Sequence, residues 1–424
     1  MKVRPRLVFV SPLTPADGGN GLAMRAGLVL EALALDHDVS LLVVPVAGPA
    51  PTAWPSFVKE RTVDRACLDL HGREDPAFSR AAGSGRVAAV RAYPRPSLCR
   101  FATDETVSAA RRAFAARSFD VVHVMRLYLA PFVTAFTGAA PLDARSVLDL
   151  DDDEVETRRR IASLHARLGQ GALMALEAAE ADKYRTMEAE WLPRFHHLLL
   201  SSGHDRAAVA ARTGHPSVHT VANGIRAPDR APAAPAEPSG AWRLLFVGSL
   251  GYFPNADAAT VLCREVLPRL RARLPRAVAV DVVGSQPAQP VIELDRIPGV
   301  RIHADPQQIA PFYARAHATV LPIRAGGGTR LKILEAFAHQ MPVISTAIGA
   351  EGIAVEPGRH LLIADEPDAL AAACANVLDD PALAARLRTE ALTLVEKRYD
   401  ARLVGEGIRR LFRRIMTARP ASGR

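Results

Sequence analysis

Short apolar strands alternate with helical segments in two series along this sequence, and a stretch rich in proline and alanine separates the two series. The first series opens with RLVFVSPL at 6–13, passes through the glycine loop ADGGNG at 16–21, and reaches DVSLLVV at 38–44 after an apolar-periodic segment. This order of strand, glycine loop, helix and strand is typical of the opening of a doubly wound parallel sheet. It restricts the chain to the α/β class.

Further strands continue both series. In the first half, buried strands are expected at 119–125, 146–152, 196–202 and 217–225. The second half begins with WRLLFVGSL and contains the apolar runs VAVDVVG, HATVLPI and PVISTAI between helix-like segments. Residues 226–240 concentrate Pro, Ala and charge without an apolar period, as linkers do. The sequence thus predicts two Rossmann-like domains, at 1–225 and 241–399, joined by a linker at 226–240.

The segment RLVGEGIRRLFRRIM at 402–416 is amphipathic. We expect a helix at about 400–417 that packs back on the N-terminal domain. Its inward side chains are expected to be Leu403, Ile408, Leu411, Phe412 and Ile415. The basic residues on the other face leave an alternative open, in which this helix lies on a membrane surface.

Length and composition narrow the function classes. A chain of 424 residues exceeds one ordinary core and fits two domains. The apolar run that starts at Leu7 ends at Ser11, too short for a signal peptide, and no stretch approaches ~18 uninterrupted apolar residues. We therefore expect a cytoplasmic protein without a spanning helix. Four scattered cysteines without a Cys-x-x-Cys pair indicate neither a zinc site nor a disulfide framework.

The net charge of +8 suggests an anionic partner such as nucleic acid, a membrane surface or a phosphorylated substrate. Five lysines and 48 arginines in an alanine-rich sequence also fit a bias in genomic base composition, so bulk charge carries little weight. No interleaving of aromatic and basic residues of the kind that stacks bases stands out. Nucleic acid is therefore not expected as a partner.

The segment AGGGTRLKILEA at 325–336 is the strongest candidate for a ligand site. Its glycines, Gly326, Gly327 and Gly328, follow the strand-like HATVLPI, where open α/β sheets bind ligands. Thr329 can cap the next helix, whose first amides then point toward the glycine loop. Arg330 and Lys332 would add two positive charges, which suit a diphosphate.

Helical spacing places Lys332, Glu335, Ala336 and His339 on one face, with Leu331, Leu334 and Ala338 toward the core. Glu335 then lies one turn beyond the phosphate end, where a carboxylate can accept hydrogen bonds from paired ribose hydroxyls. On spacing alone, a flexible glycine loop and a surface ion pair of Glu335 with an arginine remain an alternative.

Residues 320–353, VLPIRAGGGTRLKILEAFAHQMPVISTAIGAEGI, resemble the donor-binding segment of retaining GT-B glycosyltransferases of the group 1 type. These bacterial sugar transferases carry a Glu-x7-Glu signature. The similarity extends to LLFVGSL, VVGSQP, VANGI and the N-terminal GGNG segment, and so covers most of the chain. It implies that an N-terminal acceptor domain and a C-terminal nucleotide-sugar donor domain face each other across a cleft.

The resemblance also implies roles for individual residues. Glu335 corresponds to the second glutamate of the signature, which holds the nucleotide ribose. Gly18 and Gly19 match the N-domain loop that approaches the diphosphate. Glu351 lies near the nucleotide by resemblance, although from the residues alone it equally fits a turn between two glycines.

The chain departs from the family pattern in the donor segment. Gly327 stands where a glutamate usually contacts the donor sugar. The loop after the first strand of the second half offers Ser249 and Asn255 where many members carry an arginine and a lysine for the phosphates. We hypothesise that Arg330 and Lys332 replace this missing pair and serve catalysis by stabilising the leaving diphosphate.

Histidines at two further positions in the sequence are candidates for a functional role. The histidine often found two residues after the VVH strand histidine falls at Met125, which leaves His123 and Arg126 as neighbours. A histidine in such a strand is often structural, but a position at the strand's carboxyl end, facing the cleft, makes His123 a candidate catalytic residue. The pair His196 and His197 precedes an apolar strand and is interpreted as surface or packing.

The acidic run LDLDDDE at 148–154 has three interpretations. It could bind Mg²⁺, contribute to acceptor binding, or be a strand end that leads into a charged helix. The last is favoured, and no metal is expected.

The implied activity is transfer of a hexose from a nucleoside diphosphate sugar to a hydroxyl of a glycan or lipid-linked acceptor, with retention. No protein nucleophile, cofactor or metal is implied, since the cationic loop supplies positive charge. A lipid-linked acceptor would add peripheral membrane contact to the cytoplasmic location. One rival is a nucleotide-sugar-binding protein without turnover, suggested by the missing first glutamate. Another is an NAD-dependent dehydrogenase, disfavoured because ADGGNG is not Gly-x-Gly-x-x-Gly.

Overall fold

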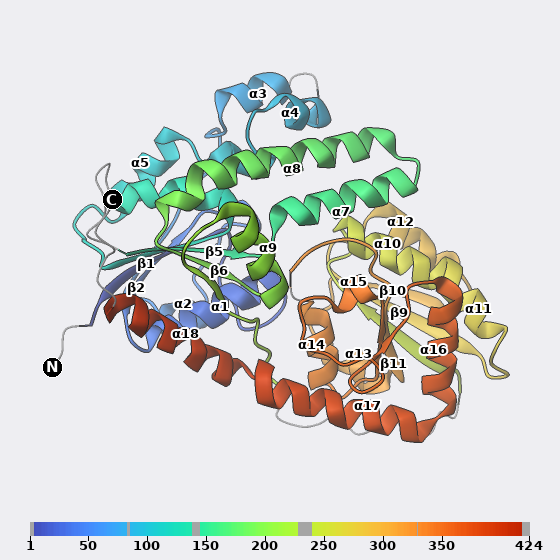
Figure 1. Cartoon of the computed structure of the whole chain (residues 1–424). Coiled ribbons are helices and arrows are strands. Elements are labelled where there is room, and N and C mark those ends of the chain that lie inside the picture. Colours follow the sequence, from blue (N-terminus) through green and yellow to red (C-terminus); the bar gives the residue numbers. More distant parts are fainter. Residues whose placement is uncertain (1–3, 83–84, 138–144, 228–239, 329, 418–424) are drawn as a thin grey trace. The chain divides into compact units, whose positions relative to one another are not determined.

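The computed structural model describes residues 4–82, 85–137, 145–227, 240–328 and 330–417 (Figure 1). Its contacts divide the chain into two units. The N-terminal unit comprises Met1–Gly224 and Arg402–Arg424, and the C-terminal unit comprises Ile225–Ala401. Most of the expected linker at 226–240 lies outside the described residues. No helix among the described residues is both long enough and apolar enough to cross a membrane.

The N-terminal unit is built on a seven-stranded parallel sheet with the order β3-β2-β1-β4-β5-β6-β7. Its strands are β1 (Arg6–Ser11), β2 (Asp38–Val43), β3 (Asp64–Cys67), β4 (Val121–Met125), β5 (Arg145–Asp151), β6 (His197–Leu200) and β7 (Val218–Thr220). Aliphatic side chains on the central strands are buried on both faces, as continuous apolar runs require. The strand order reverses between β1 and β4, so the loops that follow these two strands flank the point where doubly wound sheets bind ligands.

The helices of this unit are α1 (Gly21–Ala34), α2 (Ser56–Lys59), α3 (Pro76–Ala82), α4 (Arg86–Ala92), α5 (Asp104–Ala113), α6 (Thr134–Thr137), α7 (Glu154–Arg167), α8 (Gly171–Trp191), α9 (Gly203–Thr213), α18 (Ala401–Thr417) and the short helices η1 (Ser97–Phe101), η2 (Leu127–Val133) and η3 (Leu192–Arg194). Polar side chains set where several of them begin. Asn20 accepts a hydrogen bond from Leu22 N (2.8 Å) at α1, and Asp153 accepts one from Glu156 N (3.0 Å) at α7. The long helices α7 and α8 pack side by side (Figure 1).

The terminal helix α18 packs in the N-terminal unit through Val404, Ile408, Phe412 and Ile415. The prediction for Leu403 is wrong, because this side chain is 44% exposed and Val404 takes the inward position. Both positions are apolar, so the sequence pattern could not choose between them. On the polar side, Arg409 and Arg413 both bind Asp36, at 2.9 Å and 3.0 Å.

The C-terminal unit contains a six-stranded parallel sheet with the order β10-β9-β8-β11-β12-β13. The strands are β8 (Trp242–Val247), β9 (Val278–Gly284), β10 (Val300–Ala304), β11 (Ala318–Leu321), β12 (Val343–Ser345) and β13 (Leu362–Ile363). The helices are α10 (Phe253–Val261), η4 (Leu262–Val266), α11 (Leu267–Arg271), α12 (Gln289–Ile292), η5 (Glu293–Arg296), α13 (Ala310–Arg315), α14 (Leu331–Ala338), α15 (Ala347–Ala350), α16 (Pro367–Asp379), α17 (Pro381–Leu394) and η6 (Val395–Tyr399).

The predicted α/β class is confirmed, although the sequence reading missed three strands at or near sheet edges. Strand β3 has the sequence DRAC and is only half-buried, and β10 has the sequence VRIHA, in which Arg301 and Ala304 are exposed. Strand β13 has two residues. An edge strand buries less apolar surface, so its sequence lacks the apolar run by which the central strands were predicted.

Candidate functional site

The glycine loop of the C-terminal unit follows β11, and its backbone needs glycine. Gly326 has φ +113° and Gly328 has φ +71°, in the left-handed region that side chains rarely adopt. The carbonyl of Gly327 accepts a hydrogen bond from Arg330 Nη1 at 2.5 Å. The Arg330 guanidinium therefore binds back onto the loop and holds its carbonyl in place.

Helix α14 begins directly after this loop. Thr329, expected to cap it, lies outside the described residues, and Arg330 occupies the cap position without a side-chain cap bond. Within the helix, Ala336 is buried and Leu331 is only half-buried. The predicted faces are therefore wrong at these two positions. In so short a helix a small apolar residue such as Ala336 fits either face, and packing decides which.

Lys332 lies beside the loop that follows β8. Its Nζ donates a hydrogen bond to Asn255 Oδ1 and lies 5.6 Å from the centroid of the Phe246 ring. Asn255 Nδ2 donates in turn to the carbonyl of Ser249 at 2.9 Å. Burial, with a smaller contribution from Arg330, lowers the pKa of Lys332 to about 7. The amine of Lys332 is thus held against the loop that contains Ser249, through Asn255.

The sheet topology brings these two loops together. Strands β8 and β11 are neighbours in the sheet although many residues separate them in the sequence, because the strand order reverses here. The end of β9 approaches closely as well, since a Cβ added at Gly284 would lie 1.7 Å from the Gly248 carbonyl oxygen. Arg324, in the segment that follows β11, forms a bidentate ion pair with Asp257 of α10 (2.9 and 2.5 Å). This ion pair fixes the segment relative to α10.

Glu335 lies one turn further along α14 and is half-buried. Tyr313 of α13 donates its hydroxyl to Glu335 Oε2 at 3.5 Å, and the Tyr313 ring stacks on His339 with ring centroids 4.3 Å apart. Burial raises the pKa of Glu335 to about 7, although Tyr313 and Lys332 act in the opposite direction. The carboxylate is therefore held in place beside two stacked rings. The sequence reading missed Tyr313, because an aromatic residue in a short helix carries no ligand signal.

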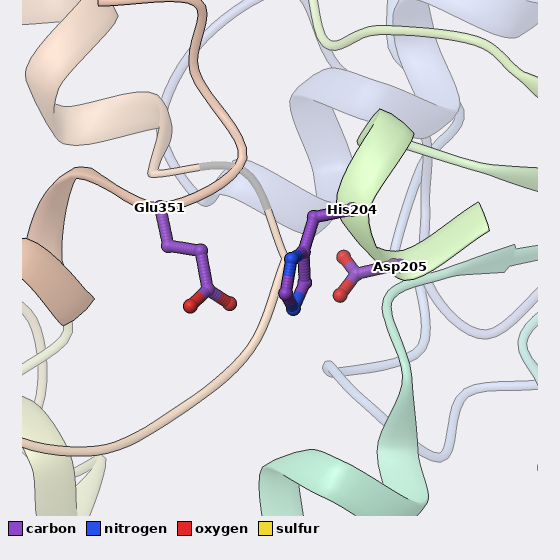
Figure 2. A group of neighbouring side chains, drawn as sticks. All are labelled: His204, Asp205 and Glu351. Atoms are coloured by element: carbon purple, nitrogen blue, oxygen red, sulfur yellow. The ribbon is translucent and has the colours of Figure 1, made fainter. Parts of the chain in front are cut away.

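Glu351 comes directly after the short helix α15 and is half-buried (Figure 2). Thr346 caps this helix by accepting a hydrogen bond from Gly349 N at 2.9 Å. A Cβ at Gly349 would lie 2.3 Å from Ser345 Oγ, so this turn after β12 requires a glycine.

In the N-terminal unit, Gly18 and Gly19 lie in the exposed loop between β1 and α1. Gly19 has φ +89°, and an added Cβ at either glycine would meet no other atom within 4 Å. The loop therefore leaves open backbone at the start of α1. His204 and Asp205, in the first turn of α9, are the other two labelled side chains of Figure 2.

His123 is the third of the five residues of β4, so the expectation that it lies at the strand's carboxyl end is wrong. Its side chain is completely buried between Phe9 and Phe412, and it stacks on Phe412 at an interplanar angle of 3°. Burial, with a smaller effect of Arg25, lowers the pKa of His123 to about 3. The ring is therefore neutral near pH 7. Arg126, with φ +72°, follows the end of the strand instead.

The acidic run after β5 is paired with arginines. Asp149 binds the buried Arg25 at 2.7 Å, and Asp153 binds Arg212 at 2.8 Å while capping α7. Asp151, Asp152 and Glu154 all bind Arg126. Burial is the main cause that raises the pKa of Asp152 to about 7. These contacts agree with the favoured interpretation of a strand end leading into a charged helix.

Residues 241–380 match the protein family described as "Glycosyl transferases group 1". The matched residues are about a third of the chain, and they contain all of the described contacts around Lys332 and Glu335. No curated protein matches the sequence.

Solved structures match nearly the whole chain, including the N-terminal unit. Sucrose-phosphate synthase from Thermosynechococcus elongatus has a TM-score of 0.72 at 16% identity, with 98% of this chain and 100% of that chain covered. A glycosyltransferase from Rickettsia africae has a TM-score of 0.63 at 12% identity, with coverage of 98% and 100%. HepE from Anabaena, solved with UDP-glucose, has a TM-score of 0.61 at 14% identity, with coverage of 97% and 100%. These likenesses confirm the predicted GT-B fold class.

Proposed function

We propose that the protein transfers a hexose from a nucleoside diphosphate sugar to a hydroxyl of a glycan or lipid-linked acceptor, with retention of configuration. The proposal rests above all on the contact of Lys332 Nζ with Asn255, which holds a cation between the loops after β8 and β11. In the free protein its side-chain nitrogen contacts a neutral amide and an aromatic ring, and the Glu335 carboxylate of the same helix acts on its charge. A diphosphate would add negative charge beside it.

The other residues have consistent roles in this proposal. Glu335 accepts hydrogen bonds from the ribose hydroxyls, and Tyr313 and His339 keep its carboxylate oriented. The amides that begin α14 point toward the diphosphate, and Arg330 orders the glycine loop that they border. Gly18, Gly19 and Glu351 belong to the proposed donor site by resemblance alone. Cationic and backbone donors of this kind stabilise a leaving diphosphate, so the proposal requires neither a metal nor a cofactor.

The first test is a thermal-shift panel of UDP-, GDP-, ADP- and TDP-sugars. UDP-sugars come first, because HepE was solved with UDP-glucose. We expect one nucleotide class to raise the melting temperature, since a ligand that binds only the folded state stabilises it by mass action. Glu335→Ala is expected to abolish the shift, whereas Glu396→Ala, at an exposed glutamate of η6, is expected to keep it. A shift of equal size in wild type and Glu335→Ala would contradict the proposed ribose contact.

A turnover measurement distinguishes a transferase from a nucleotide-sugar-binding protein without activity. The second role is the alternative suggested by Gly327 in place of the first glutamate. Release of the nucleoside diphosphate from the stabilising nucleotide sugar is measured without an added acceptor. Slow hydrolysis by wild type that is lost in Lys332→Ala would support the transferase. Tight binding with no release above a protein-free blank, with or without added glycan and lipid-linked acceptors, would favour the non-catalytic role.

Donor binding should depend on pH in a bell shape with its maximum near pH 7. Lys332 has a pKa of about 7, so its positive charge is lost as the pH rises above that value. Glu335 also has a pKa of about 7, so its carboxylate is lost as the pH falls below it. A UDP-sugar is the right titrant, because its esterified diphosphate stays ionised across this range. Calorimetry from pH 5 to pH 9 should show affinity falling on both sides, and Glu335→Gln should remove only the acid limb.

A further inference from the structure

Four histidines gather near the amino ends of β5, β6 and β7 in the N-terminal unit: His196, His197, His215 and His219. In a parallel sheet these are the strand ends opposite to the carboxyl ends, and Gly18 and Gly19 follow the carboxyl end of β1. The sequence analysis interpreted the first two as surface or packing residues. Their hydrogen bonds divide the four histidines into two kinds.

His196 and His215 form hydrogen bonds with backbone groups through their ring nitrogens. His196 Nδ1 accepts the amide of Ser146 at 3.1 Å. His215 Nδ1 accepts the amide of Ser217 at 3.2 Å, and its Nε2 donates to the carbonyl of Phe195 at 3.0 Å. These bonds fix the orientation of the His215 ring and hold Ser217 in position between β6 and β7.

His197 and His219 instead point ring nitrogens at each other. His197 Nδ1 lies 3.2 Å from His219 Nε2, and the ring centroids are 5.4 Å apart. Ser217 Oγ lies 2.7 Å from the first nitrogen and 3.0 Å from the second. A tetrahedral zinc ion with bonds of about 2.0–2.1 Å to imidazole holds two nitrogens about 3.3 Å apart. The spacing of these two nitrogens therefore already fits a shared metal ion.

The surroundings of the two rings leave room for an ion. The other ionisable groups that act on these rings are Arg145, His196 and His215. Both rings are half-exposed, and β7 is the last strand of the sheet, so an ion can enter from solvent.

We propose that His197 and His219 bind one divalent transition-metal ion of the zinc or copper type, with the Ser217 hydroxyl beside it. The ion would link the edge strand β7 to β6. The segment that follows β7 contains Val221 and Asn223, which both accept hydrogen bonds from the buried Arg25. A metal link at β7 therefore stabilises the N-terminal unit, independently of the proposed transferase activity.

The test uses full-length protein without a polyhistidine tag, and Zn²⁺ alone as the probe. Calorimetry is expected to show one saturable site in wild type, and Zn²⁺ is expected to raise the melting temperature. His197→Gln and His219→Gln are each expected to weaken binding by about 100-fold or more, because loss of even an outer-shell partner typically costs 10–100-fold. The matched control is His71→Gln, at an exposed histidine of the same unit.

Two readouts keep the test decisive. Metal-free melting temperatures and circular dichroism establish that each variant is folded, and Cu²⁺ electron paramagnetic resonance reports how many nitrogens bind the ion. Loss of nitrogen coupling in the two variants, but not in His71→Gln, would support the site. Absence of saturable Zn²⁺ binding by folded wild type, or equal affinity in wild type and both variants, would overturn it.

Discussion

Lys332→Ala is expected to lower kcat/KM for the nucleotide sugar by about 100- to 1,000-fold, the range typical when one well-aimed donor to a developing negative charge is removed. The ammonium lies against Asn255 and Phe246, between the two loops that flank the reversal of strand order in the C-terminal sheet. Without it, the proposed diphosphate site loses one of its two cationic side chains, Lys332 and Arg330. Steady-state kinetics and calorimetry with the donor identified by the thermal-shift panel measure the effect.

The stability of the same variant gives an independent check. The pKa of Lys332 falls from its usual value near 10.5 to about 7, so folding disfavours the charged form of this side chain. Removing the side chain should therefore leave the melting temperature of the unliganded protein unchanged or raise it at neutral pH, while donor binding is lost. This combination is typical of a residue kept for function at a cost in stability. A folded Lys332→Ala protein with wild-type donor affinity would contradict the role.

Two further variants separate charge from shape. Lys397→Ala removes an exposed lysine of η6 in the same unit and should leave kinetics unchanged. Lys332→Arg keeps the charge, but we expect it to restore only part of the activity, since a planar guanidinium is broader than the ammonium held between Asn255 and Phe246. The chain contains 48 arginines and only five lysines. The chain therefore uses arginine for most of its positive charges. The lysine at position 332 departs from this preference, as a site shaped for a compact cation requires.

Asp149→Ala is expected to destabilise the N-terminal unit by about 3–5 kcal/mol, because it leaves the buried Arg25 with only the more distant Asp151 (3.4 Å) as a charged partner. Arg25 is 2% exposed and binds Asp149 through Nε and Nη2, with its shortest contact at 2.7 Å. Its Nη1 donates to the Val221 carbonyl at 3.0 Å and to Asn223 Oδ1 at 2.9 Å. One guanidinium thus joins α1, β5 and the segment after β7. Urea denaturation and scanning calorimetry measure the loss.

The matched control breaks an exposed ion pair in the same unit. Arg117 Nε lies 3.1 Å from Asp64 Oδ2, and the two side chains are 38% and 39% exposed. Asp64→Ala is expected to change the unfolding midpoint little, since water solvates both charges when the pair is lost. The double variant Arg25→Met/Asp149→Leu should recover much of the stability lost in Asp149→Ala, because it removes the uncompensated charge. If Asp149→Ala and Asp64→Ala shift the midpoint equally, the buried pair does not stabilise the unit as proposed.

Local patterns were sufficient to predict most of the framework. The central strands, the glycine loops and the helix that contains Lys332 and Glu335 all stand out in the sequence, because each has its own apolar period or its own backbone requirement. Gly326 is an example, since its φ of +113° is a backbone conformation that glycine adopts readily and other residues rarely do. The arginine partners of the acidic run were not predicted, because an ion pair depends on two positions that are distant in the chain.

By itself, the sequence determined the α/β class, the order of the elements and the charged glycine segment after β11, since all of these follow from interactions between residues close together in the chain. Only the tertiary structure decided that Lys332 meets Asn255, that Tyr313 orients Glu335, that His123 is buried inside its strand, and that His197 faces His219. Each of these depends on which strands become neighbours and on how side chains fill the space between elements. Packing of the whole unit sets both, and no local pattern encodes them.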